Sequence, residues 1–173
     1  MNFTIKGISI TELENFITQN GFAKYRAHQI YNWLYKKGII DANSMHNISN
    51  ELQSFLVNNT IINTLTLSKK VHCDNTIKFL FQTKANQYIE SVSMIEGDKH
   101  TVCLSSQVGC SVDCDFCATG KMGFISNLSK GEIIDQIIMI QHHIERPITN
   151  IVFMGMGEPF LNYNNVINAA HLM

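Results

Sequence analysis

Apolar residues in the first third of the chain recur every three or four positions, which is the spacing of helices with one buried face. Ser9 and Glu12 form a capping-box pattern directly ahead of the first apolar stretch. The same spacing predicts a second helix over about 24–37 and a third over about 50–57. Residues 1–60 are therefore expected to form a small helical domain.

The pattern then changes to alternation between apolar and polar positions, which is typical of strands with one buried face. Runs rich in β-branched and aromatic residues lie at about 64–71, 76–82 and 88–95, and short turn-forming segments separate them. Consecutive strands joined by short turns pair in an antiparallel manner. Residues 61–98 are thus predicted to form a β meander.

The last part of the chain combines strands and helices. A strand is expected at 101–105, a helix runs from a second capping box at 129 to about 144, and a buried strand follows at 149–154. A crossover helix between two strands predicts that they pair in parallel, as in a βα barrel. The predicted fold class is α+β in the amino-terminal part, followed by α/β in residues 99–173, where a partial barrel begins.

Three cysteines lie close together on the loop expected after the strand at 101–105: Cys110, Cys114 and Cys117. Thiolates at this spacing suit an iron–sulfur cluster. A cluster that only carries electrons is normally closed by four cysteines, whereas three ligands leave one iron free to bind a small molecule. The motif therefore indicates a catalytic [4Fe–4S] cluster.

A structural zinc site is the alternative interpretation of the same thiols. His72, His100 or Cys103 could supply a fourth ligand. Zinc ligands usually occur as two separated pairs, however, and the spacing in this chain is different. The pattern favours the cluster.

Composition and charge narrow the class of protein. The chain of 173 residues is 45% hydrophobic and 16% charged, which is ordinary for a globular domain. A formal net charge of −1 provides no overall basic field of the kind that dominates non-specific nucleic-acid binding, so charge alone does not indicate RNA, and we expect no DNA partner. Five cysteines without a signal-peptide pattern or a membrane-spanning apolar run predict a cytoplasmic protein with no membrane partner.

A second unusual loop, Gly155-Met-Gly-Glu-Pro159, follows the last predicted strand. Glycine lets the backbone approach a ligand closely, and Glu158 could accept a hydrogen bond from an ammonium group. A glycine turn after a strand is common, so this pattern by itself is also that of an ordinary strand-ending turn. Its position two barrel elements after the cysteines makes it more specific.

The chain resembles a known family at these motifs. Phe116 precedes the third thiol, as in the radical S-adenosylmethionine (SAM) signature, and the string Val102-Cys-Leu-Ser-Ser-Gln-Val-Gly-Cys110 is similar to the radical SAM adenosine-C2 RNA methyltransferases, the RlmN family. The resemblance implies a [4Fe–4S] cluster on three cysteines, with SAM at the open iron. It also implies 23S rRNA and tRNA as substrates, and an electron donor such as a flavodoxin or ferredoxin.

The resemblance assigns roles to further residues. It implies that Gly157 and Glu158 hold the methionyl amine of SAM, with Phe116 beside the cofactor. It implies that Glu90 accepts a proton near the target base and that Cys103 helps resolve a covalent protein–RNA intermediate. From the residues alone, Glu90 is an exposed strand carboxylate and Cys103 is a small strand residue.

The helical domain carries cations interleaved with aromatic residues over 24–37, which could contact an RNA backbone and stack on bases. The cations spread around the helix instead of forming one stripe, and this is also typical of a solvated face over an aromatic core. The resemblance implies that the domain at 1–60 helps to hold RNA.

Two alternatives to this function stay open. One is the C8-methylating relative that acts on adenosine in rRNA, since it shares the motifs present in this chain. The other is a zinc-stabilised RNA-binding module without catalysis. The resemblance extends over the whole chain but over only about the first half of the family pattern, and the methyl-carrying cysteine of the family has no counterpart.

We therefore expect the purified chain of 173 residues not to complete methyl transfer by itself. The check is mass spectrometry of rRNA digests after incubation with the reconstituted chain, SAM and a reductant. Formation of C2-methyladenosine would contradict this prediction.

Overall fold

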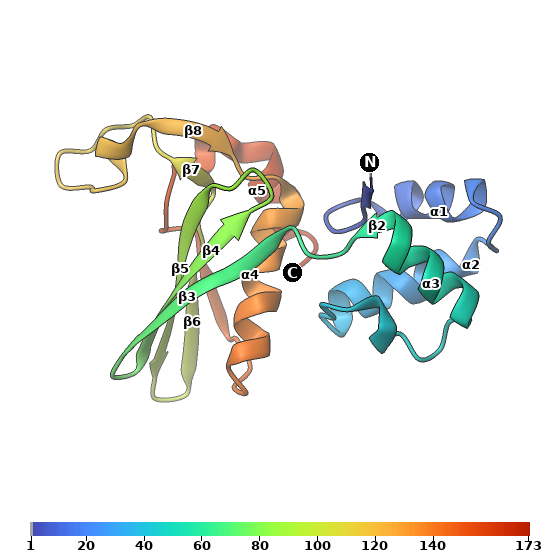
Figure 1. Cartoon of the computed structure of the whole chain (residues 1–173). Coiled ribbons are helices and arrows are strands. Elements are labelled where there is room, and N and C mark those ends of the chain that lie inside the picture. The colour runs from blue at the N-terminus through green and yellow to red at the C-terminus, as the bar shows by residue number, and fades with distance from the viewer. Residues whose placement is uncertain (1) are drawn as a thin grey trace.

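The computed structural model describes residues 2–173, which form a helical part and a sheet part lying side by side (Figure 1). The helical part contains α1 (Ile10–Gln19), α2 (Tyr25–Tyr31) and α3 (Asn50–Asn59). Their apolar faces meet in one core, as the helical spacing predicted, and its fully buried members include Leu13, Ile17, Ala27, Ile30, Leu34, Leu52 and Leu56.

The capping box ahead of α1 is present as predicted. The Ser9 hydroxyl accepts from the backbone N–H of Glu12 at 3.2 Å, and the Glu12 carboxylate accepts from the backbone N–H of Ser9 at 2.7 Å. Two helix-end donors are satisfied in this way, so the helix begins at a defined residue.

Two details of the helical part differ from the expectation. The helix expected over 24–37 is α-helical only to Tyr31 and continues as a π-helical turn, Asn32–Lys36. The strands β1 (Phe3–Thr4) and β2 (Thr60–Ile61) pair in parallel. Two-residue strands carry no readable alternation, so the sequence pattern did not indicate them.

The sheet part is built on five strands in the order β3-β4-β5-β6-β9. Their bounds are β3 (Leu65–Cys73), β4 (Thr76–Thr83), β5 (Tyr88–Glu96), β6 (Lys99–Cys103) and β9 (Asn150–Val152). The first four pair in an antiparallel manner, which confirms the predicted meander, and β6 pairs with β9 in parallel. The meander and the βα segment therefore share one continuous sheet.

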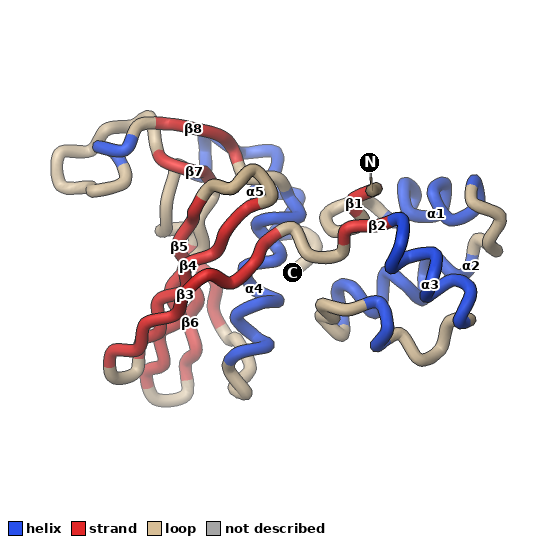
Figure 2. Tube along the Cα trace, viewed as in Figure 1, coloured by secondary structure: helices blue, strands red, loops and turns tan. Residues whose placement is uncertain are grey.

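One face of this sheet is covered by α4 (Lys130–His143), and α5 (Tyr163–Ala170) packs beside α4 (Figure 2). The core between sheet and helix includes Phe79, Phe81, Ile89, Val102, Leu104, Ile133, Ile138 and Ile140. No helix in residues 2–173 covers the opposite face of β3, β4 and β5. We call it the bare face, and residues that alternate with the core residues of these strands project from it.

The entry to the cysteine loop differs from the expectation. The strand expected at 101–105 ends at Cys103, and a short hairpin of β7 (Gln107–Gly109) and β8 (Phe124–Asn127) carries the loop. The reason is a contact with α4: the N–H and C=O of Ser105 bond to the side chain of Gln136 at 2.8 and 2.9 Å instead of to a strand. The regular ladder therefore ends there, and the chain bends into β7.

The parallel pairing of β6 and β9 across α4 confirms the predicted start of a βα barrel. Over residues 2–173, no helix combines the length and the apolar character required to cross a membrane.

The helical part and α4 are joined by a buried ion pair. Lys6 Nζ lies 2.9 Å from Asp135 Oδ1, and both side chains are fully shielded from solvent. Asp135 also accepts from the hydroxyl of Thr64 at 2.6 Å and from its backbone N–H. The carboxylate is thus paired and hydrogen-bonded, which a buried charge requires.

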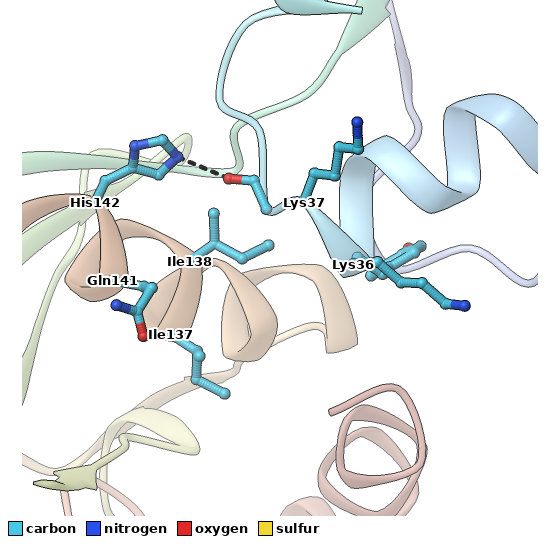
Figure 3. Close-up of a pocket in the computed structure, with 8 residues that line it drawn as sticks. Lys36, Lys37, Ile137, Ile138, Gln141 and His142 are labelled. Atoms are coloured by element: carbon cyan, nitrogen blue, oxygen red, sulfur yellow. Dashed lines mark hydrogen bonds between the residues drawn. The ribbon is translucent and has the colours of Figure 1, made fainter. Parts of the chain in front are cut away.

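Backbone contact reinforces the junction. A Cβ atom on Gly7 would lie 2.5 Å from the backbone nitrogen of Gly131. The backbones of the helical part and of α4 are therefore in close contact at this point. Tyr35 packs against both cores, its hydroxyl accepts from the N–H of Gly7 at 2.8 Å, and burial raises its pKa to about 12. His142 on α4 contacts the carbonyl of Gly38 at 2.7 Å (Figure 3).

A cavity of about 360 Å³ lies at this junction, between the end of the π-helical turn and α4. Figure 3 shows its lining residues, with the Lys36 side chain and the Lys37 side chain directed away from each other. Lys37 Nζ lies 3.8 Å from the centre of the Trp33 ring. The cations at the cavity therefore do not converge on a common point.

We predict that K6M lowers the free energy of unfolding by about 3 kcal/mol, because it leaves the Asp135 carboxylate buried without a countercharge. K24M is the matched control, since Lys24 pairs with Glu14 while 68% of its side chain is exposed. That change should cost less than about 1 kcal/mol. Urea denaturation followed by circular dichroism measures both, and equal losses would contradict the prediction.

Candidate functional site

The cysteine loop is closed at its base by the β7–β8 hairpin. The backbone N–H of Cys110 donates to the carbonyl of Gly123 at 3.1 Å. Gly109 has φ +72, and a Cβ there would lie 1.8 Å from the Gly123 oxygen, so only glycine fits this crossing. Inside the loop, the N–H of Cys117 donates to the carbonyl of Cys114 at 2.9 Å.

The three thiols are half-buried on this one loop. Backbone N–H groups of Gly120 and Thr119 donate to the Cys117 sulfur and lower its pKa, which favours the thiolate that binds metals. Among residues 2–173, however, no three His, Cys, Asp or Glu side chains are close enough together to hold a metal ion. The donor set fits an iron–sulfur cluster by its chemistry and by its place on one loop, and the convergence of the thiols stays a prediction.

Phe116, expected beside a cofactor, is 93% exposed and packs against no core. His100, one of the residues considered as a fourth zinc ligand, has both ring nitrogens engaged. Nε2 lies 2.8 Å from the hydroxyl of Ser93, and Nδ1 lies 3.0 Å from the carbonyl of Arg146. His100 is also fully buried in the sheet, so it is not available as a fourth ligand to a metal at the cysteine loop.

The glycine loop, residues 155–159, docks against the strand that leads into the cysteine loop. Gln107 on β7 accepts from the N–H of Glu158 at 2.9 Å. Gly157 has φ +92, and a Cβ there would lie 2.4 Å from the Cβ of Gln107. The strand β7 therefore contacts the glycine loop and also leads into the cysteine loop, so the two loops lie at the same end of the sheet.

Glu158 is half-buried, and its carboxylate accepts from the N–H of Phe160 at 3.0 Å. This bond caps the short helical turn Pro159–Asn162. Asn162 in turn donates from its side chain to the carbonyls of Ser106 and Leu128 at 2.7 and 2.8 Å. The carboxylate is thus held by a turn that is itself fixed to the sheet.

Glu90 and Cys103 lie on the bare face. Cys103 pairs with Val92, which is two residues from Glu90 on β5, so the two side chains are diagonal neighbours on that face. Lys78 Nζ on β4 lies 3.0 Å from the Glu90 carboxylate. Burial raises the pKa of the Cys103 thiol, which keeps it protonated at neutral pH.

A buried hydroxyl connects Glu90 with the glycine loop. Ser105 donates to the carbonyl of Glu90 at 2.5 Å and accepts from the N–H of Met156 at 2.9 Å. The N–H of Glu90 donates to the Met156 sulfur at 3.3 Å. We call these three bonds the Ser105 bridge, which joins the predicted proton acceptor to the loop predicted to bind SAM.

The side chain of Gln136 on α4 fixes the backbone of Ser105 by hydrogen bonds. Besides its two bonds to the backbone of Ser105, it accepts from the hydroxyl of Ser91 at 2.7 Å. Sequence reasoning missed Ser105, Gln136 and Met156. Two signals in the sequence could have indicated them. Gln136 is a polar residue within the apolar stretch of α4, and Ser105 and Ser106 directly follow an apolar strand.

Several cations of the helical part make intramolecular contacts. Lys24 and His28 both lie close to the Glu14 carboxylate, at 3.1 and 3.0 Å. The Arg26 guanidinium lies 4.7 Å from the centre of the Tyr25 ring. Contact between this part and RNA stays a prediction.

Comparison with known proteins gives two family matches along the chain. Residues 3–62 match the family described as "Ribosomal RNA large subunit methyltransferase N-terminal domain". Residues 104–173 match the radical SAM superfamily. The first range covers the helical part and the second begins one residue after β6.

Individual relatives cover nearly the whole chain. The chain is 44% identical to the "Probable dual-specificity RNA methyltransferase RlmN" of Cytophaga hutchinsonii over 168 residues, which is 94% of this chain and 46% of that protein. It is 42% identical to the "Dual-specificity RNA methyltransferase RlmN" of Geobacter sulfurreducens, over 98% of this chain and 47% of that protein. Over nearly its whole length the chain is therefore similar to the RlmN family. It spans about half the length of these relatives.

A solved structure agrees with this similarity in sequence. The crystal structure of a radical SAM methyltransferase from Sphaerobacter thermophilus superposes with a TM-score of 0.91 at 38% sequence identity, over 98% of this chain and 51% of that one. The agreement confirms the fold class, α+β leading into a partial radical SAM fold. The match of residues 104–173 to the radical SAM superfamily implies a [4Fe–4S] cluster and SAM as cofactors. Both relatives are named as RNA methyltransferases.

We predict that S105A lowers the free energy of unfolding by about 1–3 kcal/mol, because it leaves the Glu90 carbonyl and the Met156 N–H without partners. Hydrogen exchange at the Met156 amide should also become faster. S106A is the matched control: this neighbouring serine is equally buried, but its hydroxyl lies 3.5 Å from the nearest acceptor, the Met156 carbonyl. Equal effects of the two changes on exchange at Met156 would contradict the role assigned to Ser105.

Proposed function

We propose that the chain is part of a radical SAM RNA methyltransferase that methylates C2 of adenosine in 23S rRNA and tRNA. One arrangement carries this proposal: β7 supports both the cysteine loop and the glycine loop, and the Ser105 bridge joins the glycine loop to Glu90. The strand segment that carries Glu90 is thus connected through its backbone to the loop proposed to bind the cofactor. An RNA-binding module without catalysis has no need of this connection.

In this proposal, Cys110, Cys114 and Cys117 hold the [4Fe–4S] cluster and leave one iron open. The bound cluster supplies the electron for reductive cleavage of SAM, and the electron comes from a donor such as a flavodoxin or ferredoxin. Radical chemistry is required because a ring carbon such as C2 is too weak a nucleophile for ordinary methyl displacement. The chain's own contribution is to position the reactants and to keep water away.

Glu158 and Gly157 are proposed to receive the methionyl end of SAM. A carboxylate forms a charge-assisted hydrogen bond with an ammonium group, and the backbone at Gly157 has no side chain to obstruct the approach. The bond from the Phe160 N–H uses one carboxylate oxygen of Glu158 and leaves the other free to accept.

Glu90 is proposed to accept the proton that leaves C2 of the target base. When it takes up this proton, the carboxylate becomes a carboxylic acid. Lys78 Nζ lies 3.0 Å from this carboxylate and pairs with it on the bare face. Cys103, its neighbour on the bare face, is proposed to resolve the covalent intermediate between protein and RNA.

The experiment that tests the proposal is anaerobic reconstitution of the chain with iron and sulfide. We expect absorbance and electron spin resonance spectra of a [4Fe–4S] cluster, and cleavage of SAM to methionine and 5′-deoxyadenosine when dithionite is added. Substitution of any one of Cys110, Cys114 or Cys117 by alanine should abolish iron binding. C73A is the matched control, because Cys73 is exposed at the far end of β3, and this variant should bind iron like the parent chain.

A colourless protein that binds one zinc ion and does not cleave SAM would overturn the proposal and favour the non-catalytic alternative. Equal iron content in the C73A and C117A variants would overturn the ligand assignment. Methylation at C8 in place of C2, measured by mass spectrometry with a chain that carries the full length of the relatives, would correct the position of the methyl group.

A further inference from the structure

The bare face around Glu90 carries a group of side chains that the proposed chemistry does not use. A hollow of about 220 Å³ is lined by Lys69, Val71, Lys78, Leu80 and Glu90. Glu90 is the single carboxylate among these five lining residues, against two ammonium groups. The lining therefore combines two ammonium groups and one carboxylate with the apolar side chains of Val71 and Leu80.

The strand register places these residues on one face. Lys69 pairs with Leu80, and Val71 pairs with Lys78, so the two lysines are diagonal neighbours. Leu80 pairs with Glu90 on the next strand. The alternate residues of these strands, such as Phe79 and Ile89, are fully buried on the α4 side.

An exposed aromatic ring lies on the same face. Tyr88 precedes Glu90 by two residues on β5, so both side chains project from one side of the sheet. Tyr88 is 47% exposed, and its hydroxyl accepts from the side chain of Gln82 at 3.3 Å. The ring is thus held at the surface by a neighbour on β4 instead of turning into the core.

We infer that this part of the bare face holds RNA, with Tyr88 stacking on a base and with Lys69 and Lys78 binding phosphates beside the target adenosine. An ammonium group has three donors, and Glu90 uses one of those on Lys78, so the others stay free for phosphate oxygens. In residues 2–173 no carboxylate lies within ion-pair distance of Lys69. Stacking on aromatic rings combined with backbone charge contacts is the usual way in which sheets hold single-stranded RNA.

This inference rests on the proposed function, because that function brings an RNA base to Glu90. It assigns to the sheet a role that the sequence suggested only for the helical part. Nucleotides that flank a base at Glu90 must pass over neighbouring strands, and β3 and β4 present the cations there. The net charge of the chain is −1, so RNA binding depends on local groupings of this kind.

The experiment measures binding of the chain to a fluorescein-labelled RNA hairpin with an unpaired adenosine in its loop, by fluorescence anisotropy. K69Q should weaken binding about threefold to tenfold and reduce the salt dependence by about 0.7 in the log–log slope. K70Q is the matched control. Lys70 is the next residue on β3 and pairs with the buried Phe79, so it projects from the opposite face, and its loss should leave the affinity within about twofold.

Tyr88 provides an independent arm of the test. Y88L should weaken binding about fivefold or more, whereas Y88F retains the ring and should bind like the parent chain. Because these residues are exposed, none of the four variants is expected to change the melting temperature, and circular dichroism verifies this.

Three outcomes would overturn the inference: equal effects of K69Q and K70Q, equal effects of Y88L and Y88F, or an affinity that responds only to removal of Lys36 and Lys37 on the helical part. Absence of RNA binding by the chain would also overturn it. Each of these outcomes leaves the proposed function standing, because iron binding and SAM cleavage are measured without RNA.

Discussion

The arrangement of the candidate site depends on the need to satisfy buried peptide groups where β6 ends. Beyond Cys103 the β5–β6 ladder stops, and the N–H and C=O of Glu90 would be left without partners. The hydroxyl of Ser105 and the sulfur of Met156 take the place of a strand. Because an unpaired buried peptide group costs about 1–3 kcal/mol, this replacement fixes β5, the bend into β7 and the glycine loop relative to each other.

The same replacement explains why two loops that are distant in sequence act as one site. The cysteine loop is closed at its base by β7. The strand β7 begins where it does because the backbone of Ser105 is hydrogen-bonded to the side chain of Gln136, and the chain bends there. Gln107, the first residue of β7, then contacts the glycine loop. A side chain from α4 therefore determines where the cysteine loop and the glycine loop lie, although α4 itself carries none of the predicted functional residues.

Regular elements were readable from the sequence because their signals are local. Capping boxes and strand alternation depend on neighbours within a few residues. The structure contains the capping boxes at Ser9 and Ser129, and it contains the meander. The β7–β8 hairpin was not readable, since its cause is a hydrogen bond between Ser105 and Gln136, which are far apart in sequence. The π-helical turn before Gly38 has no sequence signal that we can identify.

The candidate site follows the same division. Motif spacing indicates the three cysteines, and resemblance to the family implies the roles of Gly157, Glu158, Glu90 and Cys103; these assignments stay predictions. The shared face of Glu90, Lys78 and Tyr88 emerges only from strand register. Neither periodicity nor motif spacing indicates which strands become neighbours, so the partners of the proposed proton acceptor can be named only from the assembled sheet.

The position of α4 has a further consequence. This helix buries Ile133 and Ile140 against the sheet, while Asp135 is paired with Lys6 of the helical part. Loss of the sheet would expose the apolar side of α4 to water, and loss of the helical part would leave Asp135 without its countercharge. The two parts are therefore thermodynamically interdependent, and heating should melt them in a single cooperative transition in spite of their separate cores.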